Sequence, residues 1–272
     1  MKHIVQFSGG VGSAMAAYLV TQQYPKEDII LLYHDVPMGQ DEDTYRFNED
    51  VSKFLGIPIT EVSDGRTLWE VINAHHSLPS MFIPFCTDDL KQKMGEKFYK
   101  TLNEPFIIYT GYCIEEKKRV EKAKEKMTRP TEFPVYEARL TSKQCKQIIA
   151  NEWGIKLPRA YKYFEHNNCI PCFKSTSYEY WRKVYEYFPE RYQLAVKAEQ
   201  LIGHTHFKQL SLLELAQLFE KNKTYNSKIT ISQYLRIKHN NEIYSDLFGK
   251  EYNSNTQSKE IPPAKAGSVD YT

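Results

Sequence analysis

A glycine-rich turn near the N-terminus is the part of the sequence best suited to chemistry. Residues 7–14 read FSGGVGSA, and they lie where a short apolar run at residues 3–7 gives way to a helical pattern. Three glycines in such a turn let backbone amides point into one concavity, and a helix N-terminus adds partial positive charge. The hydroxyl groups of Ser8 and Ser13 can donate further hydrogen bonds. The turn predicts an anion site, although a tight strand-to-helix turn that binds nothing has the same glycines.

The elements that would position this turn follow the pattern of a parallel sheet. Unbroken apolar runs at residues 3–7, 29–33 and 106–109 alternate with amphipathic segments of helical length. Such runs suit strands that are buried on both faces and joined by helices. We therefore expect an α/β fold with a Rossmann-like parallel sheet. Weaker strands are predicted at residues 59–62 and 135–138, and helices at residues 13–23, 44–55, 68–75, 88–99, 115–127 and 142–153.

The character of the sequence changes after about residue 158. Strand patterns give way to aromatic, helical sequence, with helices predicted at residues 178–187, 191–201 and 210–222. The last residues are polar and contain Pro262 and Pro263. We predict an α/β domain at residues 1–160, an aromatic-rich helical region with a cysteine knuckle at 161–250, and a flexible tail at 251–272.

Composition limits the classes of partner and compartment. The 36 Lys and Arg residues exceed the 34 Asp and Glu residues by two. The net charge is therefore too small to indicate nucleic acid or an acidic membrane as a partner. No run approaches the roughly 18 apolar residues needed to cross a bilayer, and glycine interrupts the N-terminus before an export signal could form. A cytoplasmic protein without a membrane partner is expected. The five cysteines then act as thiols, metal ligands or catalysts.

The glycine turn resembles the SGGxDS pyrophosphate loop of the N-type ATP pyrophosphatases, and in particular their phosphoadenosine phosphosulfate (PAPS) reductase-like branch. Further short blocks resemble that branch in the same order, over about residues 3–200. These blocks are HD at 34–35, DTYRF at 43–47, DGR at 64–66 with Trp69, CTDDLK at 86–91, the spacing of Gly111, Glu116 and Arg119, PVYE at 134–137, Gly154, Pro158, Tyr161, and HNNC at 166–169.

This resemblance implies an adenine nucleotide hydrolase-like domain that binds ATP or PAPS, with Mg²⁺, along the carboxyl ends of the strands. It also implies that Asp35 lies beside the nucleoside or the magnesium ion, although an aspartate there also suits a turn or a helix entry. The phosphates would contact the loop itself and a second glycine. The implied binding residues are Ser8, Gly9, Gly10, Val11, Gly12, Ser13, Asp35 and Gly111.

Three charged residues are candidates for a catalytic role. Glu116 and Arg119 are three residues apart on a predicted helix, so they share a face. The resemblance implies that Arg119 pairs with phosphate or sulfate while Glu116 orients it. Lys91 is a third candidate, as a phosphate ligand. Without the resemblance, the highly charged helix that carries Glu116 and Arg119 is typical of a solvated surface. Lys91 has an equally ordinary explanation, since lysine is common in the first turn of a helix.

The cysteines suggest a metal centre. Cys169 and Cys172 form a C-x2-C knuckle, and Cys86 adds a third thiol if its loop reaches the same edge of the sheet. Three thiolates and a fourth ligand would suit Zn²⁺ or a [4Fe-4S] cluster. The pair also suits redox thiols or small buried side chains. Cys145 lies on an amphipathic pattern and is expected in the core.

Two departures from the branch shape the functional prediction. Gly12 stands where the loop motif has Asp, and no cysteine follows Cys172 to act as the nucleophile of a thiol-based PAPS reductase. The sequence therefore predicts an ATP-dependent adenylating enzyme that transfers sulfur or another group, served by a sulfur-donor protein. Its acceptor would be nucleic acid or a small molecule. The alternative is a non-catalytic ATP- or PAPS-binding module. Interleaved aromatic and basic residues at 161–192 suit either base stacking or a core, and an oligomer is compatible with the sequence.

Overall fold

A computed structural model describes residues 1–208 and 210–225, and they divide into two compact units. The first unit comprises Met1–Val71 and Pro84–Cys169. The second comprises Ile72–Ile83 and the described residues from Ile170 onward. The first unit thus extends beyond the boundary expected at residue 160, and a short internal segment joins the second. The tail expected at 251–272 lies outside the described residues.

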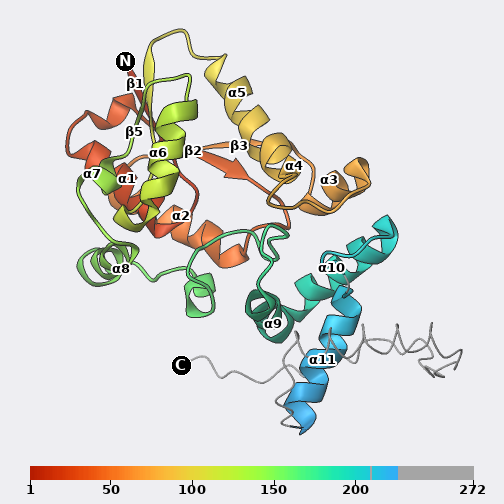
Figure 1. Ribbon diagram of the computed structural model, residues 1–272. Coiled ribbons are helices and arrows are strands. Elements are labelled where there is room, and N and C mark those ends of the chain that lie inside the picture. The colour runs from red at the N-terminus through yellow and green to blue at the C-terminus, as the bar shows by residue number, and fades with distance from the viewer. Residues whose placement is uncertain (209, 226–272) are drawn as a thin grey trace, which may run out of the picture. The chain divides into compact units, whose positions relative to one another are not determined.

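The first unit contains a five-stranded parallel sheet in the order β3-β2-β1-β4-β5, which confirms the predicted α/β class (Figure 1). β1 occupies the centre because Ile4, Val5 and their neighbours are buried on both faces. The strands are β1 (Lys2–Gln6), β2 (Ile29–Asp35), β3 (Ile59–Ser63), β4 (Phe106–Tyr109) and β5 (Thr131–Glu132).

The strand predicted at residues 135–138 is wrong. That segment forms a short helix, α7 (Pro134–Glu137), and the fifth strand lies just before it. Proline suits the first turn of a helix, because its fixed φ is helical and its missing N–H would have no partner there. Pro134 therefore begins a helix where the apolar Val135 alone suggested a strand.

Helices flank the sheet and account for the amphipathic patterns (Figure 1). α1 is rich in alanine, and its Ala14, Ala16 and Ala17 are fully buried, which lets it pack closely. The helices predicted at 88–99 and 142–153 each include a π-helical turn, at η2 (Asp88–Gln92) and η4 (Ile148–Glu152). The α-helices of this unit are α1 (Val11–Thr21), α2 (Glu42–Leu55), α4 (Phe85–Thr87), α5 (Lys93–Tyr99), α6 (Lys117–Lys126), α7 and α8 (Ser142–Gln147); α3 (Leu68–His75) spans the boundary between the units.

The second unit packs helices around aromatic side chains. Its helices are α9 (Tyr178–Tyr187), α10 (Pro189–Ile202) and α11 (Leu212–Tyr225). Trp181 is fully buried, with its ring centroid 5.5 Å from that of Phe173 and 6.0 Å from that of Tyr192. These rings form a core, so they are not available to stack on bases.

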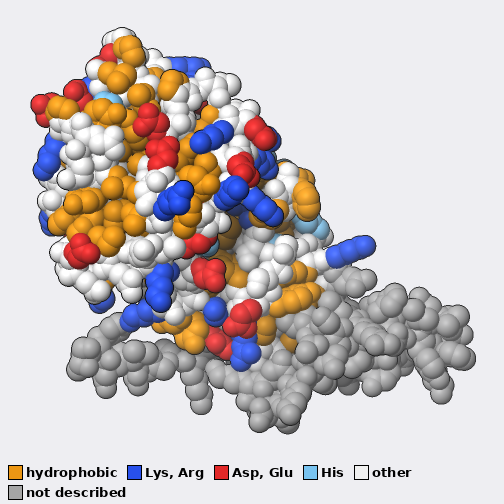
Figure 2. Space-filling view, turned by 60° about the vertical axis from the view of Figure 1, so that its left-hand side comes forward, with side chains coloured by type: hydrophobic (Ala, Val, Ile, Leu, Met, Phe, Trp, Pro, Cys, Tyr) orange, Lys and Arg blue, Asp and Glu red, His pale blue; other side chains and the backbone are white. Residues whose placement is uncertain are grey.

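The surface carries charges of both signs. Figure 2 shows Lys, Arg, Asp and Glu side chains interspersed on the face that it presents. This mixture agrees with a net charge of +2 and means that a strongly charged patch must be local. Among the described helices, none has the length and apolar character required of a membrane span.

Candidate functional site: the loop between β1 and α1

The glycine loop lies at the point where the strand order of the sheet reverses. β1 has β2 and β3 on one side and β4 and β5 on the other. In open parallel sheets, ligands bind outside the carboxyl ends of the strands at such a reversal. Residues 7–10 leave β1 at this edge, and residues 110–113 leave the neighbouring β4. The fold therefore gives the loop the position of a ligand site.

Gly9 is required by both its conformation and its surroundings. Its φ is +76°, in the left-handed region that favours glycine. A Cβ at this position would stand 2.5 Å from Cγ2 of Thr44 and 2.9 Å from Oδ1 of Asn48. Both neighbours belong to α2, so the loop backbone lies directly against that helix.

Gly12 and Gly111 bring the first turn of α1 and the end of β4 into backbone contact. A Cβ on Gly12 would lie under 3.0 Å from the carbonyl oxygen of Gly111. A Cβ on Gly111 would approach Gly12 and the amide nitrogen of Ser13 equally closely. The structure has no space for the aspartate that the related loop motif carries at this position. Gly12 is therefore explained by packing.

The two serines of the loop stabilise its shape. Oγ of Ser13 donates to the carbonyl oxygen of Gly10 at 2.9 Å and accepts from the amide of Ser8 at 3.1 Å. The Ser8 hydroxyl donates to the same Oγ at 3.3 Å. Ser13 is buried and Ser8 is exposed. Both hydroxyls are committed within the loop, so its capacity for a ligand lies in the main chain.

Several main-chain amides of the loop have no hydrogen-bond acceptor among the described residues. Gly10 precedes α1 without a side-chain cap, and the amide of Val11 donates to the Tyr161 hydroxyl at 3.0 Å. Within residues 1–208 and 210–225, no acceptor reaches four other amides. Amides at a helix N-terminus carry partial positive charge and attract anions. The four amides belong to Gly9, Gly10, Gly12 and Ser13.

Asn48 lies beside the loop as a buried amide that lacks partners. It is only 3% exposed, and neither Oδ1 nor Nδ2 has a hydrogen-bond partner among the described residues. A buried amide that loses its water without a replacement is destabilising by about 1–3 kcal/mol. Its proximity to Gly9 places this unmet hydrogen-bonding capacity at the same edge of the sheet as the loop amides. Sequence reasoning missed Asn48, although it follows Thr44 by one helical turn.

Asn167 connects the loop to α2. Its Nδ2 donates to the carbonyl oxygen of Gly9 at 2.8 Å and to Oγ1 of Thr44 at 3.0 Å. The side chain thus crosses from the HNNC block to the DTYRF block. These two blocks and the glycine loop, far apart in sequence, meet in one place.

Replacement of Asn167 by alanine should loosen this connection. We expect the free energy of unfolding to fall by about 1–2 kcal/mol, because the Gly9 carbonyl group and Thr44 lose a shared partner. Chemical denaturation of Asn167→Ala would measure the loss. The neighbouring Asn168 is exposed, so Asn168→Ala is the matched control and should leave stability unchanged. Equal stability of the two variants would contradict the connecting role.

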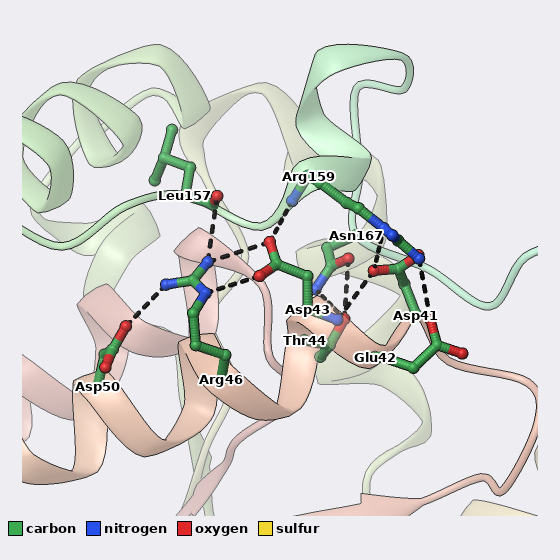
Figure 3. Close-up of polar contacts among 9 residues, drawn as sticks. All are labelled: Asp41, Glu42, Asp43, Thr44, Arg46, Asp50, Leu157, Arg159 and Asn167. Atoms are coloured by element: carbon green, nitrogen blue, oxygen red, sulfur yellow. Dashed lines mark hydrogen bonds and ion pairs between the residues drawn. The ribbon is translucent and has the colours of Figure 1, made fainter. Parts of the chain in front are cut away.

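An ionic network fixes the segment that carries Tyr161 (Figure 3). Nε of Arg159 contacts both carboxylate oxygens of the buried Asp41 at 2.9 Å. The Arg159 amide donates to Asp43 at 2.7 Å. Asp43 also accepts from Arg46, which holds the pKa of that carboxyl group below its usual range. This network attaches residues 157–159 to the start of α2 and so positions the Tyr161 hydroxyl at the Val11 amide. Burial raises the pKa of Tyr161 to about 12.

Asp35 and Lys91 lie near other strand ends. Asp35 ends β2, and its Oδ1 accepts from the Tyr45 hydroxyl at 2.5 Å. Lys91 lies in η2, close enough to His34 for its charge to affect that imidazole. Burial, and secondarily Lys91, lowers the pKa of His34 to about 4. Asp35 therefore has a structural hydrogen bond, and Lys91 lies next to a neutral histidine.

His34 should make stability depend on pH. Its pKa is about 4 in the folded chain and about 6.5 when unfolded, so the unfolded chain binds the proton more readily. Stability should be complete above about pH 6.5 and fall as the pH approaches 4, with a loss of about 2 kcal/mol by pH 5. Urea denaturation at both ends of this range should show a weaker dependence for His34→Gln. The exposed His76 provides a control, since His76→Gln should retain the wild-type profile.

Glu116 and Arg119 form the ion pair that their spacing suggested. Oε1 of Glu116 accepts from Arg119, and its Oε2 accepts from the Cys113 amide at 2.9 Å. The Arg119 guanidinium lies 4.3 Å from the ring centroid of Tyr112 and remains 62% exposed. Glu116 and the Tyr112 ring thus orient an exposed guanidinium. Tyr112 directly follows Gly111, the residue in contact with the loop.

No group of possible metal ligands is found among the described side chains. Across residues 1–208 and 210–225, no three or more His, Cys, Asp or Glu side chains are grouped as ligands, and this includes Cys86, Cys169 and Cys172. Cys145 is fully buried, as predicted. It shares a hydrogen bond with the buried Cys113, which raises the pKa of Cys145 and lowers that of Cys113.

No protein-family model matches the chain. The chain is 27% identical over 205 residues to the uncharacterized nin region protein ORF290 of Escherichia phage lambda. The match covers 65% of this chain and 67% of that protein. The chain is therefore similar to a phage protein whose name states no activity, and the candidate site rests on its own geometry.

Proposed function

We propose that the chain binds the polyphosphate of an adenine nucleotide, ATP or PAPS, at the loop between β1 and α1. The observation that carries this proposal is the pairing of four loop amides that lack protein acceptors with the buried Asn48 amide beside them. Phosphate oxygens accept hydrogen bonds from amides of this kind and favour the positive end of a helix. The position at the strand-order reversal and the resemblance to pyrophosphate loops point to the same ligand class.

The reaction that this site would serve is nucleotidyl transfer. An acceptor oxygen would attack the α-phosphorus of ATP, the bond to the bridging oxygen would break, and pyrophosphate would leave as AMP joins the acceptor. The loop amides would hold the phosphate oxygens of the nucleotide and of the leaving pyrophosphate. Mg²⁺ bound with the nucleotide would supply further charge neutralisation. A sulfur or amine nucleophile would then displace AMP, with nucleic acid or a small molecule as acceptor.

A nucleotide-binding module without turnover is the second candidate. The contact between Gly12 and Gly111 favours it, because this contact leaves no space for the carboxylate of the related loops. Such a carboxylate is a natural magnesium or phosphate-positioning group. A chain that lacks it can retain the loop amides and so keep the capacity to bind.

Isothermal titration with ATP and Mg²⁺, and separately with PAPS, tests the shared proposal. We expect saturable binding that inorganic pyrophosphate competes away. Absence of binding at millimolar nucleotide would overturn both candidates. An assay of pyrophosphate release, with and without added nucleic acid, then separates them, because the enzyme releases pyrophosphate when its acceptor is present and the binding module never does.

A further inference from the structure

Helix α6 is a local concentration of positive charge. Its sequence, KKRVEKAKEK, contains six cations and two carboxylates, so it contributes 6 − 2 = +4 in ten residues. The whole chain carries only +2. Only Val120 of this helix is buried, and the charged side chains are exposed.

Four of these six cations form no ion pair with the described side chains. Lys117 pairs with Glu121 at 3.7 Å, and Arg119 pairs with Glu116. Among the side chains that the structure describes, no carboxylate lies within the 4.0 Å of an ion pair around the remaining four lysines. These are Lys118, Lys122, Lys124 and Lys126. Four of the six cations of the helix are therefore not ion-paired among the described residues.

Three of the lysines form a strip. Lys118, Lys122 and Lys126 are spaced four residues apart, which places them on one side of the helix at steps of about 6 Å. Val120, which faces the protein, is two residues from Lys118 and from Lys122 and so lies on the opposite side. An exposed row of ammonium groups suits a chain of anionic groups better than a single small anion.

Arg119 adds a planar group beside the strip. Its guanidinium lies over Tyr112 and is held by Glu116, yet 62% of the side chain is exposed. A guanidinium stacked on an aromatic ring offers its other face to a second flat group, and nucleic-acid bases stack in this way.

We propose that α6 is a docking surface for a nucleic-acid strand. Phosphates of the strand would lie along Lys118, Lys122 and Lys126, and a base would stack on Arg119. The combination of a cation row and a planar stacking group is typical of surfaces that bind single strands. This proposal does not require nucleotide binding at the loop, so either can fail alone.

Fluorescence anisotropy with a labelled single strand of about 20 nucleotides tests the proposal. The test variant is Lys118→Gln/Lys122→Gln/Lys126→Gln in the full chain, because glutamine preserves helix propensity. We expect an affinity loss of about tenfold or more at low salt, and a salt slope smaller by about two. The matched control, Lys26→Gln/Lys97→Gln/Lys100→Gln, removes the same charge from exposed lysines outside α6 and should retain most of the affinity.

Three outcomes would overturn the assignment. Equal losses in the two triple variants would show a response to net charge alone. No binding of the wild-type chain at low salt would leave α6 as a solvated surface. Binding of phosphatidylserine vesicles through α6, without binding of the oligonucleotide, would identify a membrane in place of nucleic acid.

Discussion

Gly12→Ala should lower the free energy of unfolding by about 2–3 kcal/mol, although alanine is the better helix former. The added methyl group would stand under 3.0 Å from the Gly111 carbonyl oxygen, which is backbone and cannot rotate away. The first turn of α1 or the segment after β4 would have to shift. Urea denaturation without nucleotide measures this cost directly.

Gly10→Ala is the matched control for this experiment. A Cβ on Gly10 would find its nearest neighbour, the Tyr161 hydroxyl, at 3.4 Å, and the backbone there is extended. Its stability should change by less than about 0.5 kcal/mol. Equal stability of both variants would show that the contact between Gly12 and Gly111 opens without cost.

The same contact changes what an aspartate at this position would do. Gly12→Asp carries the same Cβ as alanine, so it should be destabilised before its carboxylate can act on magnesium or phosphate. Restoring the aspartate therefore also requires the backbone at residue 111 to move away from α1. The two glycines function as a pair between the first turn of α1 and the segment after β4.

The sequence predicts the position of the loop well, and the reasons are local. An apolar strand, a run of glycines and an alanine-rich helix follow one another without interruption, and each has a strong local preference. The strand expected at 135–138 is wrong because apolar residues alone do not distinguish a short strand from a short helix. Pro134 was the signal that separates them.

The partners of the loop depend on tertiary structure and could not be derived from spacing. Asn167 and Thr44 are 123 residues apart in sequence, and their hydrogen bond with the Gly9 segment exists only after the chain folds. The resemblance marked both blocks without stating what they contact. Whether Cys86 joins the knuckle of Cys169 and Cys172 likewise depends on tertiary structure, and no group of three possible ligands is found among the described side chains.

Asn48→Leu should raise the stability of the protein without nucleotide and lower its affinity for ATP. Leucine has a similar branched shape but no polar atoms, so it removes a buried amide that has no partner. Without nucleotide, the free energy of unfolding should rise by about 1–2 kcal/mol. If Asn48 serves the ligand, affinity for ATP should fall by about tenfold to a hundredfold, since a hydrogen bond to a charged phosphate is worth about 1.5–3 kcal/mol.

The expected gain in stability and loss in ATP affinity distinguish a binding role from a structural one. A residue retained for packing would lose stability on replacement and leave affinity unchanged, and that result would return Asn48 to a purely structural role. Asn151→Leu provides the control, because Asn151 is exposed and neither property should change. Binding sites often contain residues that lower the stability of the fold, because function requires them. A buried polar group without a partner in the unliganded chain is such a residue. Denaturation and titration on the same two variants therefore decide whether the edge of the sheet beside Gly9 is built for a nucleotide.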